Sequence, residues 1–174
     1  IYGGFPAGGS EWQQRDPNIY KAVLSGDLNN NDEPGFINND ENSCHVVEGY
    51  TKFTMDGFTI TGGNSDNYDL GYDVEHLYGG GMLLSYSDAS LANCAFISNI
   101  AHHGGGMYIH NYSNVNLENC KFISNIASDA AGALGGHQSN ATLINCDLVG
   151  NAVFGTPYSS GGAIMVDYAS LVLE

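Results

Sequence analysis

A nine-residue segment occurs three times in this chain at a constant spacing. Each copy begins with leucine, carries an Asn-Cys pair at its third and fourth positions and ends in asparagine. The copies are Leu91–Asn99, Leu117–Asn125 and Leu143–Asn151, and their cysteines, Cys94, Cys120 and Cys146, are evenly spaced. A fixed period of about 26 residues indicates a stacked repeat architecture, in which each unit buries its apolar face against its neighbours.

A second, glycine-rich motif recurs between these segments. Its copies are Gly79-Gly-Gly-Met82, Gly104-Gly-Gly-Met107, Ala131-Gly-Ala-Leu134 and Gly161-Gly-Ala-Ile164. The last glycines of the copies, Gly81, Gly106, Gly132 and Gly162, recur at nearly the same period, with a longer final step. A degenerate first repeat covers 55–63, with Phe58 in the cysteine position and Ile60 in the phenylalanine position. A last copy begins at Ala169 and stops before its Asn-Cys pair, so we expect the repeats to be truncated in mid-repeat.

The spacing within a copy favours strands over helices. Leu91, Cys94 and Phe96 lie at offsets of zero, three and five, which do not share one face of a helix, whereas Cys94 and Phe96 alternate as on a pleated strand. Glycine and asparagine tolerate the left-handed backbone of sharp turns and are poor in helix interiors. Short strands with such corners, repeating once per coil, predict an all-β parallel β-helix of about 26 residues per rung, with rungs about 4.8 Å apart.

The predicted stacking assigns equivalent residues to columns. Three inward apolar columns are expected: Met55, Leu91, Leu117, Leu143 and Leu173; Phe58, Cys94, Cys120 and Cys146; Ile60, Phe96, Phe122 and Leu148. Two polar columns are expected at bends, with side-chain amides bonding along the stack: Asn93, Asn119 and Asn145; Asn99, Asn125 and Asn151. The cysteines are within reach of one another, but parallel side chains suit a disulfide dihedral poorly, so we predict a column of free thiols.

The repeat resembles that of the polymorphic outer-membrane proteins, which are autotransporter adhesins, and of the wider group of secreted bacterial right-handed β-helix repeat proteins. The pairing of Gly-Gly-Ala-Ile or Gly-Gly-Gly-Met with Phe-Ile-Ser-Asn carries the first likeness. The segments Tyr2–Phe5, Arg15–Pro17, Leu24–Leu28 and Gly57–Asn64 carry the second. The resemblance implies a right-handed coil, a secreted or cell-surface location and a scaffold role; the motifs define a fold and not an activity.

Composition limits the classes of partner. Lys and Arg number 4 against 19 Asp and Glu, for a formal net charge of −15. Nucleic-acid binding needs a basic surface, so the charge argues against it. No apolar run approaches the roughly 18 residues of a membrane span, so we expect no membrane insertion by this segment. We expect residues 1–45, which lack the repeat, to form an N-terminal cap and irregular first rung, and 46–174 to form the β-helix.

Insertions into the repeats fall at one corner of the predicted coil. They comprise 64–78, 101–103, 128–129 and 152–160, which should line one edge because rungs stack in register. Loops on a rigid scaffold commonly carry binding function. The candidate binding residues there are Asp69, Asp73, Glu75, His76, His102, His103, Asp129 and Tyr158. A metal pair at His102 and His103 is disfavoured, because adjacent side chains diverge on extended backbone.

A second candidate site lies in the N-terminal region. Asp27, Asn29 and Asn31 place oxygen donors at alternate positions and Asp32 follows them, a donor set that suits Ca²⁺. The run lacks the glycine and distal glutamate of an EF-hand. The alternative is a solvated turn rich in Asp and Asn.

These observations favour a non-catalytic extracellular β-helix module of a surface adhesin or autotransporter-like protein, whose edge loops bind a glycan or a cell-surface protein. One alternative is a polysaccharide-active enzyme. A hydrolase would use two carboxylates of the acidic edge. A lyase would need a base, usually Lys, Arg or His, with Ca²⁺ to hold a uronate, and none of Arg15, Lys21, Lys52 and Lys121 is an evident partner of the acidic loop. Another alternative is a filament subunit that self-associates end to end, because the last rung should expose Leu171 and Leu173.

Overall fold

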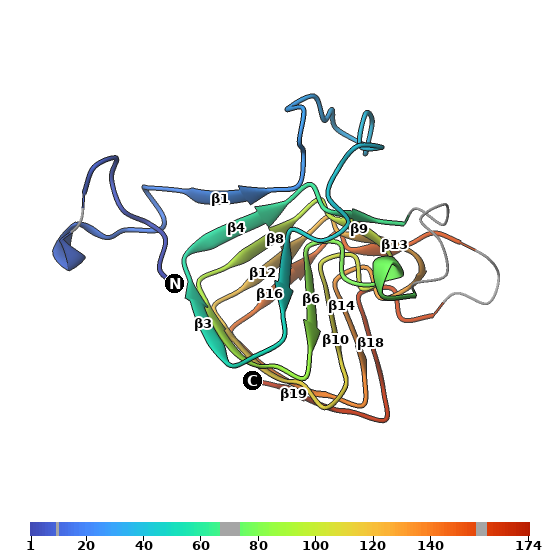
Figure 1. Cartoon of the computed structure of the whole chain (residues 1–174). Coiled ribbons are helices and arrows are strands. Elements are labelled where there is room, and N and C mark those ends of the chain that lie inside the picture. Colours follow the sequence, from blue (N-terminus) through green and yellow to red (C-terminus); the bar gives the residue numbers. More distant parts are fainter. Residues whose placement is uncertain (10, 67–73, 156–159) are drawn as a thin grey trace.

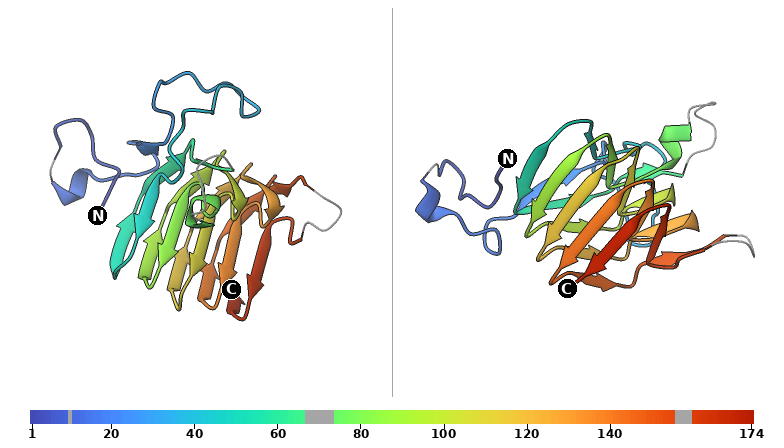
Figure 2. Two further views of the ribbon diagram at one scale, coloured as in Figure 1. Left: turned by 45° about the vertical axis from the view of Figure 1, so that its right-hand side comes forward. Right: turned by 90° about the horizontal axis from the view of Figure 1, so that it is seen from below.

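Short strands joined at sharp corners wind into a coil whose successive turns lie directly over one another. The structure is a computed structural model that describes residues 1–9, 11–66, 74–155 and 160–174. Figure 1 looks along the coil, and Figure 2 shows the turns side by side from two other directions. Every strand pairing in the described residues is parallel apart from one isolated bridge between Glu33 and Ile37. The predicted all-β parallel β-helix is therefore confirmed.

Four parallel sheets run along the coil, and each full rung contributes one strand to each sheet. The β8 sheet contains β1 (Ala22–Ser25), β4 (Phe58–Thr61), β8 (Ala95–Ile97), β12 (Lys121–Ile123) and β16 (Asp147–Val149). The β9 sheet contains β5 (Asn64–Ser65), β9 (Ile100–His103), β13 (Ile126–Ala130) and β17 (Ala152–Val153). The β10 sheet contains β2 (Val47–Gly49), β6 (Met82–Ser85), β10 (Met107–His110), β14 (Leu134–His137) and β18 (Ile164–Asp167). The β11 sheet contains β3 (Phe53–Asp56), β7 (Asp88–Ala92), β11 (Asn114–Glu118), β15 (Asn140–Ile144) and β19 (Ser170–Leu173).

The core is a set of apolar columns in the predicted register. Leu117 pairs with Leu91 below it and Leu143 above it, and Met55 and Leu173 extend the column at either end. The neighbouring column is Leu24, Ile60, Phe96, Phe122 and Leu148. The rings of Phe96 and Phe122 are fully buried and stack with centroids 4.7 Å apart. The leucine and phenylalanine columns are thus confirmed, and the core continues one strand further, to Leu24.

One repeat step is longer than the motif spacing predicts. Met107 pairs with Met82 in the preceding rung and with Leu134 in the following rung, and the second of these steps is the longer. Alignment on the last glycine of each motif predicts that Gly132 is equivalent to Gly106. The pairing of Met107 with Leu134 makes Ala133 the equivalent residue instead, so this rung contains an additional residue before β14. The residue belongs to β13, where it shapes the candidate site described below.

Corners of the rung are turned by residues in the left-handed region. Between the β11 and β8 sheets this residue is an asparagine in three rungs: Asn93, Asn119 and Asn145 have φ of 51–52° and are exposed, and Gly57 with φ of 80° takes this position in the first rung. The corner that leads into the β10 sheet uses Gly79, Gly104, Ala131 and Gly161, with φ of 60–64°. Asparagine and glycine adopt this conformation at low cost, which explains why they mark the repeat.

The two asparagine columns have different roles. In the column of Asn99, Asn125 and Asn151 the side-chain amides form a continuous ladder: Asn99 Nδ2 donates to Asn125 Oδ1 at 3.0 Å, and Asn125 Nδ2 donates to Asn151 Oδ1 at 2.9 Å. Asn99 and Asn125 are fully buried. In the other column the backbone conformation is the evident requirement, and Asn93 Nδ2 bonds to Asp56 instead of to an asparagine. The predicted amide ladder is confirmed at the Asn99 column.

The four cysteines are free thiols, as the sequence predicts for the repeat column. Cys94 and Cys120 are buried, and their Sγ atoms donate to backbone carbonyls of the coil. Contact with the Cys94 side chain, together with burial, raises the pKa of Cys120, and burial raises the pKa of Cys146. These thiols behave as small apolar side chains of the core.

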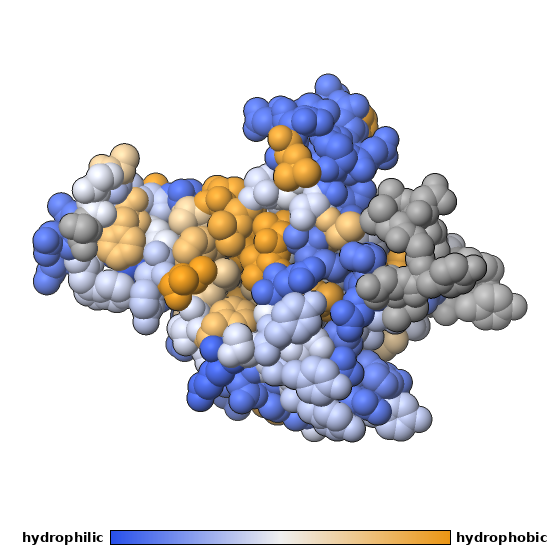
Figure 3. All heavy atoms as spheres, viewed as in Figure 1, coloured by the Kyte–Doolittle hydropathy of each residue, from blue (hydrophilic) through white to orange (hydrophobic). Residues whose placement is uncertain are grey.

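The N-terminal region contributes a strand to the first rung. β1 pairs with β4, and the 3₁₀ helix η1 (Trp12–Gln14) lies beyond it. Arg15 forms an ion pair of 2.6 Å with Asp56 of β3 and lies against the Trp12 ring. Figure 3 shows apolar side chains across this end of the coil, where Val47, Phe53 and Met55 line an apolar hollow.

The opposite end exposes part of the last rung. The side chain of Leu173 is 63 % exposed, as predicted, whereas Leu171 is half-buried against the core. Among the described residues, no helix is both long enough and apolar enough to cross a lipid bilayer.

Candidate functional site

A β-bulge brings a cluster of polar residues together on the β9 sheet. β13 pairs with β9 through Ala127 opposite Ala101 and Ala130 opposite His103, so that His102 alone faces both Ser128 and Asp129. A bulge redirects side chains relative to a regular strand. Ser128 therefore meets His102, and Asp129 meets His103.

The cluster is tightly connected. His102 Nδ1 lies 2.8 Å from Ser128 Oγ, and Ser128 in turn donates a hydrogen bond to Asp66. His103 Nε2 lies 3.7 Å from Asp129 Oδ2, and the two imidazole rings meet edge to face with centroids 4.5 Å apart. One potential ligand atom from each of His102, His103 and Asp129 lies within 4.8 Å of the other two. We predicted that the adjacent histidines diverge; this prediction is wrong, because β9 ends at His103, where Gly104 turns the chain with φ of 64°.

A second group of side chains lies on the outer face of the β10 sheet. Tyr108 of β10 pairs in register with Leu83 and Gly135. The ring lies over Gly135, where a Cβ atom would stand only 2.6 Å from Tyr108 Cδ2. Tyr78, which follows the 3₁₀ helix η3 (Val74–Leu77), stacks on Tyr108 with ring centroids 4.5 Å apart and planes inclined by 14°. The missing side chain at Gly135 thus provides the space for a pair of stacked tyrosines.

These tyrosines border a groove that contains a buried histidine. The groove has a volume of about 370 Å³ and is lined by Glu75, Tyr78, Tyr108, His110, Asn111 and His137. His110 is only 8 % exposed, and among the described residues its Nε2 atom has no hydrogen-bond partner. A buried polar atom without a partner is costly, commonly by about 1–3 kcal/mol. Such an atom in a groove indicates a place where a ligand or water supplies the missing hydrogen bond.

Burial keeps the central groups of both sites uncharged near neutral pH. It lowers the pKa of His110, and the neighbouring Glu75 only partly opposes this effect. Burial also lowers the pKa of His103. Burial, with a smaller contribution from Tyr78, raises the pKa of Tyr108 to about 12. The surface therefore offers neutral imidazole and phenol groups, which can both donate and accept hydrogen bonds.

The predicted edge is confirmed in part. The described parts of the four insertions all lie on the β9 sheet or directly beside it, although 101–103 and 128–129 form strands and not loops. His102, His103 and Asp129 form the cluster, Glu75 lines the tyrosine groove, and His76 stacks on His45. Asp69, Asp73 and Tyr158 lie outside the described residues. The roles of all these residues stay predictions.

Sequence reasoning missed two of the groove residues. His110 and His137 each follow the first residue of a β10-sheet strand by three positions, so they occupy equivalent places in successive rungs. A repeat alignment on Met107 and Leu134, which start these strands, would have placed the two histidines in one column. The alignment on the last glycine of each motif is shifted by one residue at this step, so it does not place them together.

The described acidic residues near the predicted edge line two grooves and the histidine cluster. Glu75 and Asp129 lie in the tyrosine groove and the histidine cluster, respectively. Asp40 and Asp66 line another groove, together with Phe36 and Phe154. Asp66, however, accepts a hydrogen bond from Ser128 and lies 3.9 Å from His102 Nδ1, so it is engaged within the histidine cluster. Burial raises the pKa of Asp66.

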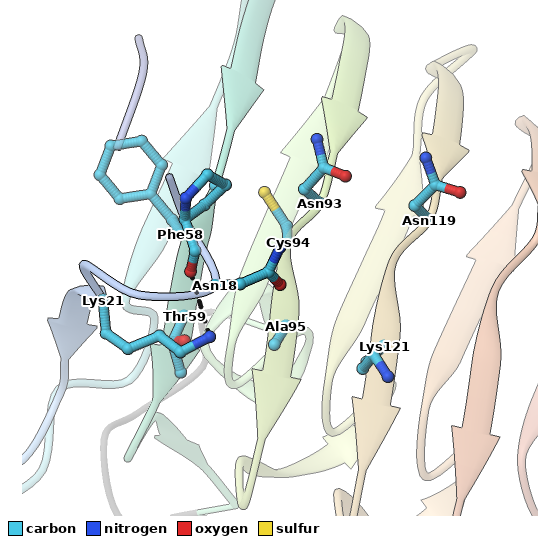
Figure 4. Close-up of a pocket in the computed structure, with 11 residues that line it drawn as sticks. Asn18, Lys21, Phe58, Thr59, Asn93, Cys94, Ala95, Asn119 and Lys121 are labelled. Atoms are coloured by element: carbon cyan, nitrogen blue, oxygen red, sulfur yellow. Dashed lines mark hydrogen bonds between the residues drawn. The ribbon is translucent and has the colours of Figure 1, made fainter. Parts of the chain in front are cut away.

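Two of the four basic residues line a small pocket on the β8 sheet (Figure 4). Lys21 donates to the carbonyl of Pro17, and Lys121 forms an ion pair of 3.1 Å with Asp147. The remaining lining residues are uncharged. Neither lysine belongs to the histidine cluster or the tyrosine groove, so neither place contains a lysine that could act as the base of a lyase.

The candidate calcium loop is folded around its own aspartate. Asp27 accepts hydrogen bonds from the backbone N–H groups of Asn31 and Asp32, so its carboxylate is engaged within the loop. Asp32 accepts a bond from Asn42, and burial, with Asp27 and Glu41 nearby, raises the pKa of Asp32. The side chain of Asn29 is exposed. Calcium binding at Asp27, Asn29, Asn31 and Asp32 stays a prediction.

Four parallel sheets that repeat with every turn of the coil define a parallel β-helix scaffold with polar groups on its outer faces. The family model described as the right handed beta helix region matches residues 27–171. The match covers most of the chain, so the protein belongs to the right-handed β-helix family. Searches of curated proteins and of solved structures found no significant match.

Proposed function

We propose that this chain is a non-catalytic, carbohydrate-binding β-helix module of an exported, surface-exposed protein, and that the tyrosine groove binds the glycan. The observation that carries the proposal is the buried His110 Nε2 atom, which has no partner among the described residues and lies in a groove beside two stacked tyrosines. An adhesin or autotransporter-like role accords with the resemblance of the repeats and with a rigid scaffold that presents a binding face.

The groove has the chemistry that sugars require. A sugar ring presents C–H faces that pack on aromatic rings, and hydroxyl groups that need donors and acceptors at fixed positions. Tyr78 and Tyr108 provide the aromatic surface. His110, Asn111 and His137 provide polar groups around it, and Glu75 provides an acceptor. A sugar hydroxyl that bonds to His110 Nε2 would supply the hydrogen bond that this atom lacks among the described residues.

Charge selects among glycans. With 4 basic against 19 acidic residues, the chain repels anionic ligands, and none of its Lys or Arg residues lines this groove. A neutral or amino-bearing glycan is therefore favoured over a uronate-rich polysaccharide. This preference also separates the proposal from a lyase, whose substrate is a uronate.

Binding of the purified chain to a panel of neutral, acidic and amino-bearing glycans tests the proposal. We expect a neutral or amino-bearing glycan to bind, and we expect the variants Tyr108→Ala and His110→Ala to weaken binding at least tenfold, or about 1.4 kcal/mol. Tyr20→Ala is the matched control, because Tyr20 is exposed on the N-terminal segment, away from the groove. Calorimetry measures the affinities, and circular dichroism verifies that each variant is folded.

Two outcomes would contradict the proposal. One is the absence of binding to every glycan on the panel. The other is a glycan that binds wild type and the Tyr108 and His110 variants with equal affinity. Release of new reducing ends from a bound polysaccharide would instead support the hydrolase alternative.

A further inference from the structure

We infer that His102, His103 and Asp129 form a binding site for a divalent transition-metal ion of the zinc class. One potential ligand atom from each of the three residues lies within 4.8 Å of the other two. The inference does not depend on glycan binding, since it concerns the bulge on the β9 sheet and not the tyrosine groove.

The distances suit an ion bound between the side chains. Two ligands that each lie about 2.0–2.2 Å from a tetrahedral zinc ion are about 3.3–3.6 Å apart. His103 Nε2 and Asp129 Oδ2 are 3.7 Å apart, so a small side-chain rotation would bring both within bonding distance of one ion. Their side chains are 21 % and 38 % exposed, which leaves the site accessible from solvent.

The surrounding hydrogen bonds orient His102 for this role. Ser128 has a single hydroxyl proton and donates it to Asp66, so Ser128 Oγ accepts the proton of His102 Nδ1. This assigns the tautomer in which the lone pair is on Nε2, a form in which histidine binds metals. A metal-binding histidine commonly gives its other N–H to a carboxylate, directly or through a hydroxyl or water, and that partner fixes the ring orientation. Asp66 is the carboxylate here, reached through Ser128.

The paired backbone of β9 and β13 fixes the positions of the three proposed ligands. Ala101 and Ala127, which flank the site, are fully buried and paired in register, so the bulge is anchored on the core. The two histidines therefore come from one strand end and the carboxylate from the bulge of the next rung. A site on rigid strands loses less conformational entropy on binding than a site on a long loop.

The donor set selects the metal. Two imidazole nitrogens and one carboxylate favour zinc, nickel and copper, whereas calcium and magnesium require oxygen ligands. Three protein ligands leave a fourth coordination position for water or an exogenous group, as in open zinc sites. The site is thus chemically distinct from the predicted calcium loop at Asp27–Asp32.

Calorimetric titration of the full chain with zinc chloride, in the absence of any glycan, tests the inference. We expect one zinc ion to bind per chain, and we expect Asp129→Asn and His103→Ala to weaken the affinity at least tenfold. We expect Ser128→Ala to weaken it about 10- to 100-fold through loss of the oriented His102 ring. Asp147→Asn is the control, because Asp147 pairs with Lys121 outside the cluster. Calcium and magnesium chloride should not compete.

Cobalt(II) provides a second measurement of metal binding. It is made on the wild-type chain, so it does not depend on whether a variant folds. Binding of cobalt at a tetrahedral nitrogen and oxygen site produces visible absorption, which should appear with wild type and be displaced by one equivalent of zinc. Failure of wild type to bind zinc would overturn the inference. So would zinc binding of equal affinity in wild type and in the Asp129→Asn variant, which retains the shape of the side chain.

Discussion

Replacement of Gly105 by alanine is expected to lower the free energy of unfolding by about 3 kcal/mol or more. Gly105 lies in the corner that leads into the β10 sheet, and its backbone bonds to the rungs on both sides, to Gly81 and Ala131. A Cβ atom at this position would overlap the carbonyl oxygen of Ile126 and would stand 2.8 Å from that of Gly132. Because both obstacles are backbone atoms of the core coil, the rungs themselves would have to separate.

Gly162 provides the matched control, since it occupies the corresponding corner in the last rung. Its carbonyl accepts the bond from Gly132, and no heavy atom lies within 4 Å of a Cβ built on it. We expect Gly162→Ala to change the free energy of unfolding by less than about 0.5 kcal/mol. Urea denaturation followed by circular dichroism measures both variants. Equal effects of the two substitutions would show that the close approach of stacked rungs does not explain the regular spacing of glycines along the chain.

Asn125→Ala is expected to destabilise the protein by about 3–5 kcal/mol, because its amide serves several buried partners at once. Asn125 Oδ1 accepts bonds from the backbone N–H and Nδ2 of Asn99, and Asn125 Nδ2 donates to Phe96 O and Asn151 Oδ1. All four contacts lie within or at the border of the core, and Asn125 itself is fully buried. Each buried partner left without a hydrogen bond costs about 1–3 kcal/mol.

The control for this substitution is Asn116→Ala, which removes the same side chain from an outward position of β11. Asn116 is exposed and pairs laterally with Ser90 and Thr142. We expect Asn116→Ala to change the free energy of unfolding by less than about 0.5 kcal/mol. Thermal and urea unfolding compare the two variants. An effect of Asn125→Ala no larger than that of Asn116→Ala would mean that the amide ladder contributes little to stability.

Sequence periodicity predicts the architecture because a solenoid core depends on local repeats. The Asn-Cys pair and the Phe-Ile-Ser-Asn motif fix which residues face inward, so the columns of Leu117 and Phe122 follow from spacing alone. The asparagine ladder follows for the same reason, since one buried amide per rung must find its partners in the next rung. The step between Met107 and Leu134 could not be placed from the last glycine of each motif, because alanine takes that position in the two later copies, at Ala133 and Ala163.

The candidate sites depend on departures from the repeat, and these are harder to predict. One extra residue in β13 makes the bulge that directs Ser128 and Asp129 toward the histidines. Spacing reveals that a residue is added, but not the direction in which its neighbours then point. The tyrosine groove requires Gly135, whose missing side chain gives Tyr108 its space, and Tyr78, which arrives through an insertion. Such contacts between one insertion and another rung leave no periodic signal.

A distance measurement along one outer column tests the stacking of the rungs most directly. Thr54, Ser90, Asn116, Thr142 and Val172 are successive register partners in the β11 sheet. Thr54 and Val172 are exposed, so nitroxide labels can be attached there through ketone-bearing unnatural residues without touching the native thiols. Four strand spacings of about 4.8 Å place the two backbones about 19 Å apart. Pulsed electron–electron double resonance measures the distance between the two nitroxide labels, and we expect one narrow distribution centred at about 20 Å. A mean distance above about 30 Å would contradict the stacked coil.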